Sequence, residues 1–161
     1  AKFLMPWKIP PIFVAGFDGL FKTTNSGKNW QDTNIAGAVA NHIHHIAISP
    51  NFANDQTLAL STLFYAPYLS HNQGKNWQSI ERGVQLDGLL KQYLITNIIS
   101  FTFSPNYRND QTLLASTWGS LFKTTDQGKH WKKLWVPKPL RADSYLTVSP
   151  HFGVDQTLYL T

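Results

Sequence analysis

Two motifs alternate three times along the 161-residue chain, separated by short strand-like segments, and together they predict an all-β repeat fold. The first, the Gly-Lys-Trp motif, reads Ser/Thr-x-Asp/Asn-x-Gly-Lys-x-Trp, and the second, the Ser-Pro motif, reads Ser-Pro-x-Phe/Tyr-x-x-Asp-Gln-Thr-Leu. Trp30, Trp77 and Trp131 of the first motif are separated by 47 and 54 residues. Four strands at a period of about 50 residues are typical of one β-propeller blade. We therefore predict a β-propeller of four-stranded antiparallel blades, about three of which are present.

The segments between the motifs are rich in β-branched and aromatic residues and are bounded by Gly, Pro, Asn and Asp, as strands are. The second unit is predicted to have strands at 44–49, 57–63, 67–70 and 77–81, and the third at 98–104, 112–117, 120–124 and 131–136. The first strand of each unit alternates apolar and small residues, which favours packing between neighbouring blades. The chain, 1–161, is interpreted as a single partial propeller with units at 11–34, 43–81, 98–136 and 144–161, the first and last being partial blades.

The Gly-Lys-Trp motif has a mechanical explanation. Its Asn or Asp side chain can accept a hydrogen bond from a main-chain N–H group two residues on, while its Gly supplies a positive φ in a hairpin turn. Its Trp then opens the fourth strand as a large apolar anchor. The residues with this expected structural role are Thr23, Asn25, Gly27, Trp30, Ser70, Asn72, Gly74, Trp77, Thr124, Asp126, Gly128 and Trp131.

The Gly-Lys-Trp motif resembles the Asp box, or BNR repeat, of sialidase-like β-propellers, and the Ser-Pro motif looks like the companion repeat of bacterial Asp-box proteins. The resemblance extends from about Ile12 to Thr161. That family includes sialidases, xyloglucan-cleaving glycosidases, sortilin-type receptors and a photosystem II assembly factor. The resemblance therefore implies the fold but not one activity, and it implies that the motif is a peripheral folding device on the face away from catalysis.

The order of strands in a blade predicts which face is free for function. Both repeated motifs should lie on one face, and the turns between second and third strands, with the links between blades, should lie on the other. Because loops on a rigid scaffold usually carry function, we expect a ligand or partner there. The longest link, 82–97, has apolar spacing that suits a short amphipathic helix, either covering its own blade or acting as a partner-binding lid. The candidate residues are Asp18, Tyr65, Arg82, Asp87, Tyr93, Trp118, Arg141 and Asp143.

No catalytic residue is predicted. A sialidase-like site would need an arginine cluster and a Tyr paired with Glu, but the chain has three Arg, and Glu81 is its one Glu. A xyloglucanase-like site would need two carboxylates flanking the bond, for which only Asp18, Asp87 and Asp143 remain, and nothing in the sequence brings two of them together. His42, His44 and His45 offer imidazoles without an evident third ligand, so neither a metal nor a cofactor is expected.

The composition excludes several further kinds of site and partner. The chain has no cysteine, which excludes a disulfide framework, a cysteine zinc site and a thiol nucleophile. Its net charge of +5 suggests an acidic partner, but the lysines are dispersed, so nucleic-acid binding is not predicted. No apolar run approaches the roughly 18–20 residues of a spanning helix, and no transmembrane segment is expected.

These observations favour a non-catalytic binding or scaffolding module that mediates protein–protein or glycan interaction, including as a subunit of a larger complex. The alternative is a fragment of a sialidase-like or xyloglucanase-like glycoside hydrolase. The expected partner is a protein or an extracellular glycan, and the expected location is secreted, periplasmic or at the cell surface. Because propellers typically close with about 4–8 blades, further blades are expected from additional sequence or from another copy.

Overall fold

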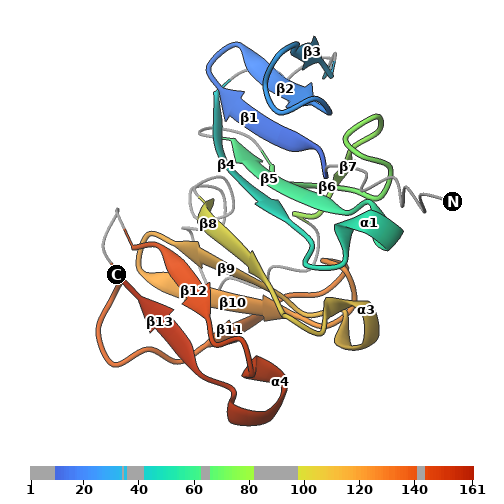
Figure 1. Ribbon diagram of the computed structural model, residues 1–161. Coiled ribbons are helices and arrows are strands. Elements are labelled where there is room, and N and C mark those ends of the chain that lie inside the picture. The colour runs from blue at the N-terminus through green and yellow to red at the C-terminus, as the bar shows by residue number, and fades with distance from the viewer. Residues whose placement is uncertain (1–9, 34, 36–41, 63–65, 82–97, 141–143) are drawn as a thin grey trace, which may run out of the picture.

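The computed structural model describes residues 10–33, 35, 42–62, 66–81, 98–140 and 144–161, which form four antiparallel sheets (Figure 1). In each sheet the strands are neighbours in chain order. The predicted all-β fold of four-stranded antiparallel blades is confirmed. The sheets are β1 (Ile12–Gly16), β2 (Gly19–Thr23) and β3 (Gln31–Asp32); β4 (Ile43–Ile48), β5 (Leu58–Thr62), β6 (Tyr68–Ser70) and β7 (Gln78–Ser79); β8 (Ile98–Phe103), β9 (Leu113–Thr117), β10 (Ser120–Thr124) and β11 (Lys132–Leu134); and β12 (Leu146–Val148) and β13 (Leu158–Leu160).

The predicted strands of the two complete sheets agree with the observed ones, with small differences at their ends. The clearest differences concern Trp77 and Trp131, which were expected to open the fourth strand but precede it, since β7 begins at Gln78 and β11 at Lys132. Each indole is turned onto the preceding sheet. Among the described residues, no helix is long and apolar enough to cross a membrane.

The Ser-Pro motif folds into a one-turn helix in each of its three copies. These helices are α1 (Phe52–Asp55), α3 (Tyr107–Asp110) and α4 (Phe152–Asp155). In α1 the Ser49 hydroxyl donates to Asp55 Oδ2 at 2.6 Å, and the Thr57 N–H donates to Asp55 Oδ1 at 2.9 Å. Gln56 ends the helix in the left-handed region at φ 53°. The motif thus closes on itself through its carboxylate.

The Gly-Lys-Trp motif is closed by a different hydrogen-bond pattern from the one expected. In the third copy, Asp126 Oδ1 accepts the N–H of His130, four residues on, at 3.0 Å, rather than an N–H two residues on. The Thr124 hydroxyl donates to the same oxygen at 2.7 Å and accepts the N–H of Gly128 at 3.0 Å. The first and second copies form equivalent bonds with Asn25 and Asn72. The hydroxyl and the Asx side chain therefore tie the turn together as a pair.

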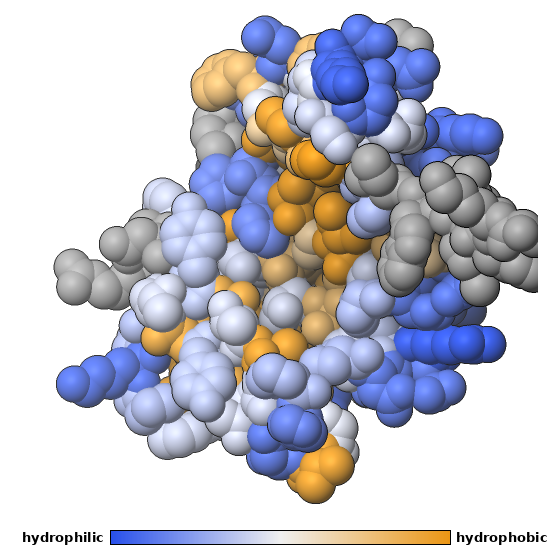
Figure 2. Space-filling view, in the orientation of Figure 1, coloured by the Kyte–Doolittle hydropathy of each residue, from blue (hydrophilic) through white to orange (hydrophobic). Residues whose placement is uncertain are grey.

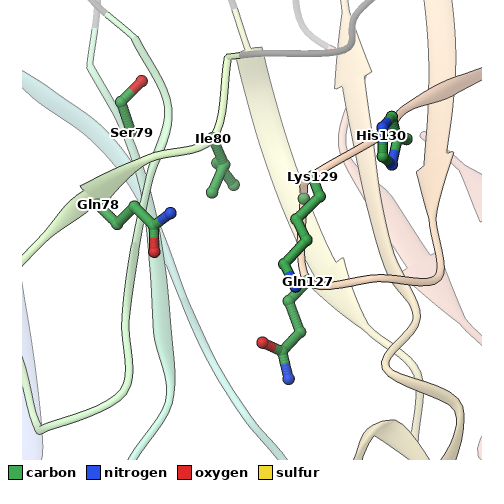
Figure 3. A pocket seen from close by; sticks show the side chains of 7 residues that line it. Gln78, Ser79, Ile80, Gln127, Lys129 and His130 are labelled. Carbon is green, nitrogen blue, oxygen red and sulfur yellow. The ribbon is translucent and has the colours of Figure 1, made fainter.

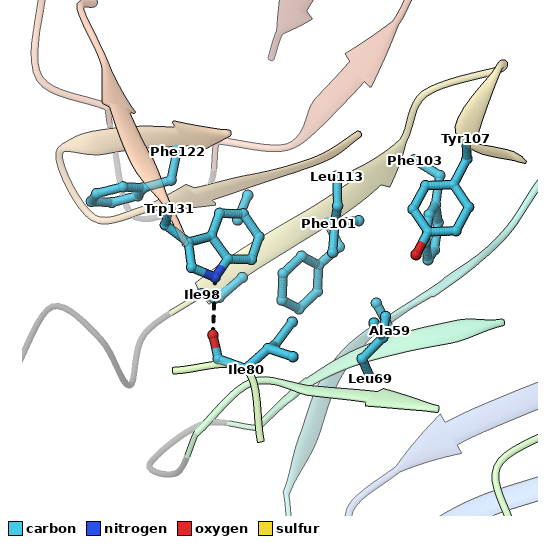
Figure 4. Close-up of a cluster of buried hydrophobic side chains, with 11 residues drawn as sticks. Ala59, Leu69, Ile80, Ile98, Phe101, Phe103, Tyr107, Leu113, Phe122 and Trp131 are labelled. Carbon is cyan, nitrogen blue, oxygen red and sulfur yellow. Dashed lines mark hydrogen bonds between the residues drawn. The ribbon is translucent and has the colours of Figure 1, made fainter. Parts of the chain in front are cut away.

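Neighbouring sheets are joined by the tryptophan of this motif. The indole N–H of Trp131 donates to the main-chain oxygen of Ile80, at the end of the preceding sheet, at 2.9 Å (Figure 4). Its ring packs in a buried cluster with Leu69, Phe101 and Phe122, drawn from both sheets. The inner strands β4, β8 and β12 also contact one another in that order. Each blade is thus held to the preceding one at its rim as well as along its inner strand.

A glycine substitution tests this docking. An alanine at residue 128 would place its Cβ 2.8 Å from the Cβ of Ile80, with φ at +85°. We expect Gly128→Ala to lower the free energy of unfolding by about 2–4 kcal/mol, from overpacking together with left-handed strain.

The matched control is Gly27→Ala, which has the same φ of +85° but no atom nearer than 3.8 Å. It should cost only about 1–2 kcal/mol, from backbone strain alone. Urea denaturation followed by tryptophan fluorescence measures both values. Equal losses in the two variants would contradict close docking of the third turn on Ile80.

Candidate binding face

The two repeated motifs lie together at one end of the strands, and the other turns lie at the opposite end. At the motif end, the Gln73 N–H of one motif donates to the Gln56 oxygen of the other at 3.0 Å. At the opposite end, the Gly119 N–H in the β9–β10 turn donates to the oxygen of Leu140, in the link that follows β11, at 3.0 Å. The helices α1, α3 and α4 follow one another along the motif end (Figure 1). We call the end that carries the β1–β2 and β9–β10 turns the loop face.

Exposed aromatic side chains are found at the loop face. Phe17 in the β1–β2 turn is 72% exposed and Trp118 in the β9–β10 turn is 55% exposed. Trp135 is 84% exposed, and because Leu134 pairs with Leu121, residue 135 continues β11 towards the same end. Tyr145, also exposed, precedes β12 there. In the view of Figure 2, hydrophobic residues gather over β1 and β4, and hydrophilic residues border them.

Two of the predicted site residues lie in described turns of this face. Asp18 is exposed next to Phe17 in the β1–β2 turn, and Trp118 is exposed in the β9–β10 turn. The structure does not bring these two into contact. The other six candidates lie outside the described residues, as does the helix expected within 82–97: Tyr65, Arg82, Asp87, Tyr93, Arg141 and Asp143.

Several side chains that were not among the predicted site residues also lie on this face. Phe17 and His42 form an edge-on pair with ring centres 4.4 Å apart, and the His42 N–H donates to the Phe17 oxygen at 3.5 Å. Trp135 and Tyr145 were also omitted. The sequence could have indicated Phe17, because it follows β1 in the same way that Trp118 follows β9. The position of Trp135 could not be predicted in this way, because it follows from the pairing register of β11 with β10.

His44 and His45 bridge the inner strands of two blades. The His45 Nδ1 accepts the N–H of Phe101 at 3.3 Å, and the His44 Nδ1 lies 3.3 Å from the Ile99 oxygen. At the next seam the Ser100 hydroxyl takes the place of His45 and accepts the N–H of Leu146 at 3.2 Å. Within the described ranges, no group of three His, Asp or Glu is placed to hold a metal ion.

The repeated carboxylates are committed to the fold. Each of these carboxylates accepts two hydrogen bonds from its own copy of the motif, one from a serine hydroxyl at 2.6 Å and one from a threonine N–H. They belong to Asp55, Asp110 and Asp155. Two hydrogen bonds lower the pKa of Asp155: the one from the Ser149 hydroxyl has the larger effect, and the one from the Thr157 N–H has the next largest. These groups are occupied at the motif end, so the loop face must draw any acidic group from elsewhere, such as Asp18.

Four-stranded sheets arranged side by side through their inner strands are the blades of a β-propeller, and that is the fold of this chain. Solved structures share it. An ancestral GH74 enzyme matches with a TM-score of 0.67 and 18% identity, over 93% of this chain and 20% of its own. The GH74 xyloglucanase from Xanthomonas campestris matches with a TM-score of 0.63 and 18% identity, over 88% of this chain and 23% of its own.

A binding protein shares the fold as well. An auxiliary nutrient-binding protein from Bacteroides thetaiotaomicron matches with a TM-score of 0.62 and 9% identity, over 94% of this chain and 32% of its own. The chain thus spans between a fifth and a third of the length of these three proteins. No family model and no curated protein sequence matches the chain. At these identities, the similarity establishes the fold alone.

The histidine bridge predicts a pH dependence of stability. Burial first, and the charge of His44 second, lower the pKa of His45 below its ordinary 6.5. The folded state therefore favours neutral His45, and stability should fall as the pH drops below the unfolded-state pKa and on through the folded-state pKa. Between about pH 7.5 and about pH 5, native protein should lose about 2–4 °C more in melting temperature than His45→Ser.

Serine is the matched replacement because Ser100 makes the same bond at the next seam. Burial also lowers the pKa of His71, but His71 is present in both proteins, so its effect on the melting temperature cancels in the comparison. Calorimetric melting curves across this pH range give the measurement. Parallel pH profiles for the two proteins would show that His45 does not titrate with unfolding.

Proposed function

We propose that this chain is a non-catalytic binding or scaffolding propeller module that engages a glycan or a protein partner through the loop face. The observation that carries this proposal is the set of exposed aromatic rings at that end of the strands, with Phe17, Trp118 and Trp135 most prominent. Aromatic rings with polar edges are the usual anchors of both sugar and protein contacts. The similarity to a xyloglucanase and a nutrient-binding protein supports a glycan as the first ligand to test.

The distribution of free and occupied polar groups agrees with binding rather than chemistry. The motif carboxylates are bound within their own turns, and the exposed carboxylates at the described part of the loop face, Asp18 next to Phe17 and Glu81 after β7, belong to different blades. Hydrolysis of a glycosidic bond ordinarily needs two carboxylates that flank the bond, roughly 5–10 Å apart. We further propose a secreted, periplasmic or cell-surface location, since polysaccharides and nutrients are met outside the cytoplasm.

Removal of the aromatic rings tests the proposal. Trp118→Ala and Trp135→Ala should each weaken binding of a soluble xyloglucan by about tenfold, because loss of a stacked ring costs about 1–2 kcal/mol. Titration calorimetry or affinity electrophoresis measures the change, and a panel of other neutral polysaccharides extends it. The matched control is Val154→Ser, which removes an 89% exposed apolar side chain in α4, at the motif end.

If Val154→Ser weakens binding as much as the tryptophan variants do, the loop face is not the binding surface. If no polysaccharide binds and a purified protein complex does, the same tryptophan variants should abolish that association. Retained association in both variants would refute the proposal.

The second candidate function is a glycoside hydrolase fragment, favoured by Asp18 at the loop face and by the likeness to GH74 enzymes. It predicts release of reducing ends from xyloglucan that Asp18→Asn abolishes while leaving binding intact. Binding without release of reducing ends would favour the module over the enzyme.

A further inference from the structure

Positive charge is concentrated on the hairpin formed by β10 and β11. Residues 120–138 contain five lysines and a single carboxylate, Asp126. Lys129 lies in the turn, Lys132 and Lys133 are exposed on β11, and Lys138 is exposed beyond it. The hairpin lies at the rim of its blade because β11 is the outermost strand of the sheet order. Lys138 follows Trp135 in the link after β11, whereas the other lysines lie on the hairpin itself.

Two of these lysines face each other across the hairpin. Lys123 and Lys132 are direct cross-strand partners, so their side chains leave the sheet on the same face. The ammonium of Lys123 lies 5.7 Å from the ring centre of Phe152, within range of a cation–π contact. Like charges placed directly opposite each other normally destabilise a sheet. The contact with Phe152 favours Lys123 alone and leaves the like-charge pairing with Lys132 without a described compensating contact.

The neighbouring blades show that the fold does not require this pair. The same two positions hold Lys22 and Gln31 in the first sheet, and Leu69 and Gln78 in the second. Leu69 is buried and Gln78 is exposed, so an apolar and a neutral polar residue satisfy the same geometry. Only the third blade places like charges opposite each other at these positions, and the other two avoid it. Such an exception in one blade is the pattern expected of a functional site.

The paired lysines line a hollow that contains a single carboxylate, Asp126. Lys123, Thr125, His130 and Lys132 line it together with Asp126, Trp131 and Leu134. The Asp126 Oδ2 lies 2.7 Å from the His130 Nδ1. Burial works to raise the pKa of Asp126, but hydrogen bonds from the His130 N–H, Thr124 and the His130 ring lower it to about 2. Asp126 therefore stays ionised, and the two ammonium groups of Lys123 and Lys132 against this one carboxylate leave the hollow with a net positive charge.

A second hollow lies on the other side of the same turn, and His130 lines both. In this second hollow, Gln127 and Lys129 from the turn lie opposite Gln78 and Ile80 of the preceding sheet (Figure 3). Its polar side-chain groups are two amides, an ammonium, the hydroxyl of Ser79 and the His130 imidazole. We call the two hollows together the rim track; they flank the same turn and carry ammonium groups on both sides of it.

We propose that the rim track binds an anionic polysaccharide, whose carboxylate or sulfate groups lie between Lys123 and Lys132 and near Lys129. Amides and hydroxyls beside the ammonium groups suit a polymer that carries hydroxyls as well as charge. A single-stranded nucleic acid would need exposed rings on which bases stack, and Trp131, the one ring in either described hollow besides the His130 imidazole, is buried. The bound anion also relieves the repulsion between the two lysines.

The test uses polygalacturonate and heparin as the carboxylate and sulfate probes, with the full chain. Lys123→Leu/Lys132→Gln copies the Leu69 and Gln78 pair of the second blade, so the hairpin should remain folded. We expect about tenfold or greater loss of affinity for whichever probe native protein binds, together with a weaker dependence of affinity on salt. The melting temperature of this variant without ligand should be equal to or above that of native protein, since the like-charge pair is gone.

The control, Lys28→Gln/Arg108→Gln, removes the same net charge from exposed positions outside both hollows. It should keep native affinity. An equal loss in the control, or equally tight binding of single-stranded DNA by native protein, would show charge attraction without a site and overturn the proposal. Binding of neither probe would overturn it as well, and none of these results bears on the loop face.

Discussion

The docking of each Gly-Lys-Trp turn on the preceding sheet is the contact on which the arrangement of blades depends. Where a complete sheet precedes the turn, Trp131 is buried and its indole N–H is satisfied by Ile80. Gly128 allows the turn to lie against the Ile80 side chain with no room for a Cβ. In contrast, Trp30 in the first sheet is 44% exposed. The motif is thus completed by its neighbour, as expected of a repeat that stacks.

The two seams formed in this way differ in their polar contacts. Trp77 docks on the first sheet beside Leu20 and Leu58, but its indole N–H is buried without a hydrogen-bond partner among the described residues. Thr33 occupies the place of Ile80 and directs both its N–H and its hydroxyl to the Leu20 oxygen. The two seams thus differ in that the Trp131 indole N–H is satisfied by Ile80 and the Trp77 indole N–H has no such partner among the described residues.

The sequence predicted the strands well because the two motifs mark two of the turns in each unit, between the first and second strands and between the third and fourth. It did not predict α1, α3 and α4, since a helix of four residues leaves no periodicity in the sequence and is held by the Ser49 and Asp55 side chains instead. The loop face was predictable from strand order, and Asp18 and Trp118 lie there. Trp135 and the Lys123–Lys132 pair were not predicted, because their positions follow from the register of β10 with β11, which the composition of neither strand reveals.

The repeat itself separates residues that serve the fold from residues left free. Where the blades agree, as at Ser49, Ser104 and Ser149 with their carboxylates, each group is consumed by a bond within the motif. Where they differ at one geometric position, as with Leu69 and Lys123, the fold tolerates either residue. A costly choice at a tolerant position requires a compensating interaction, and the facing ammonium groups of Lys123 and Lys132 can obtain it from an anion. The rim of the third blade is thus the second surface, beside the loop face, that we propose for binding.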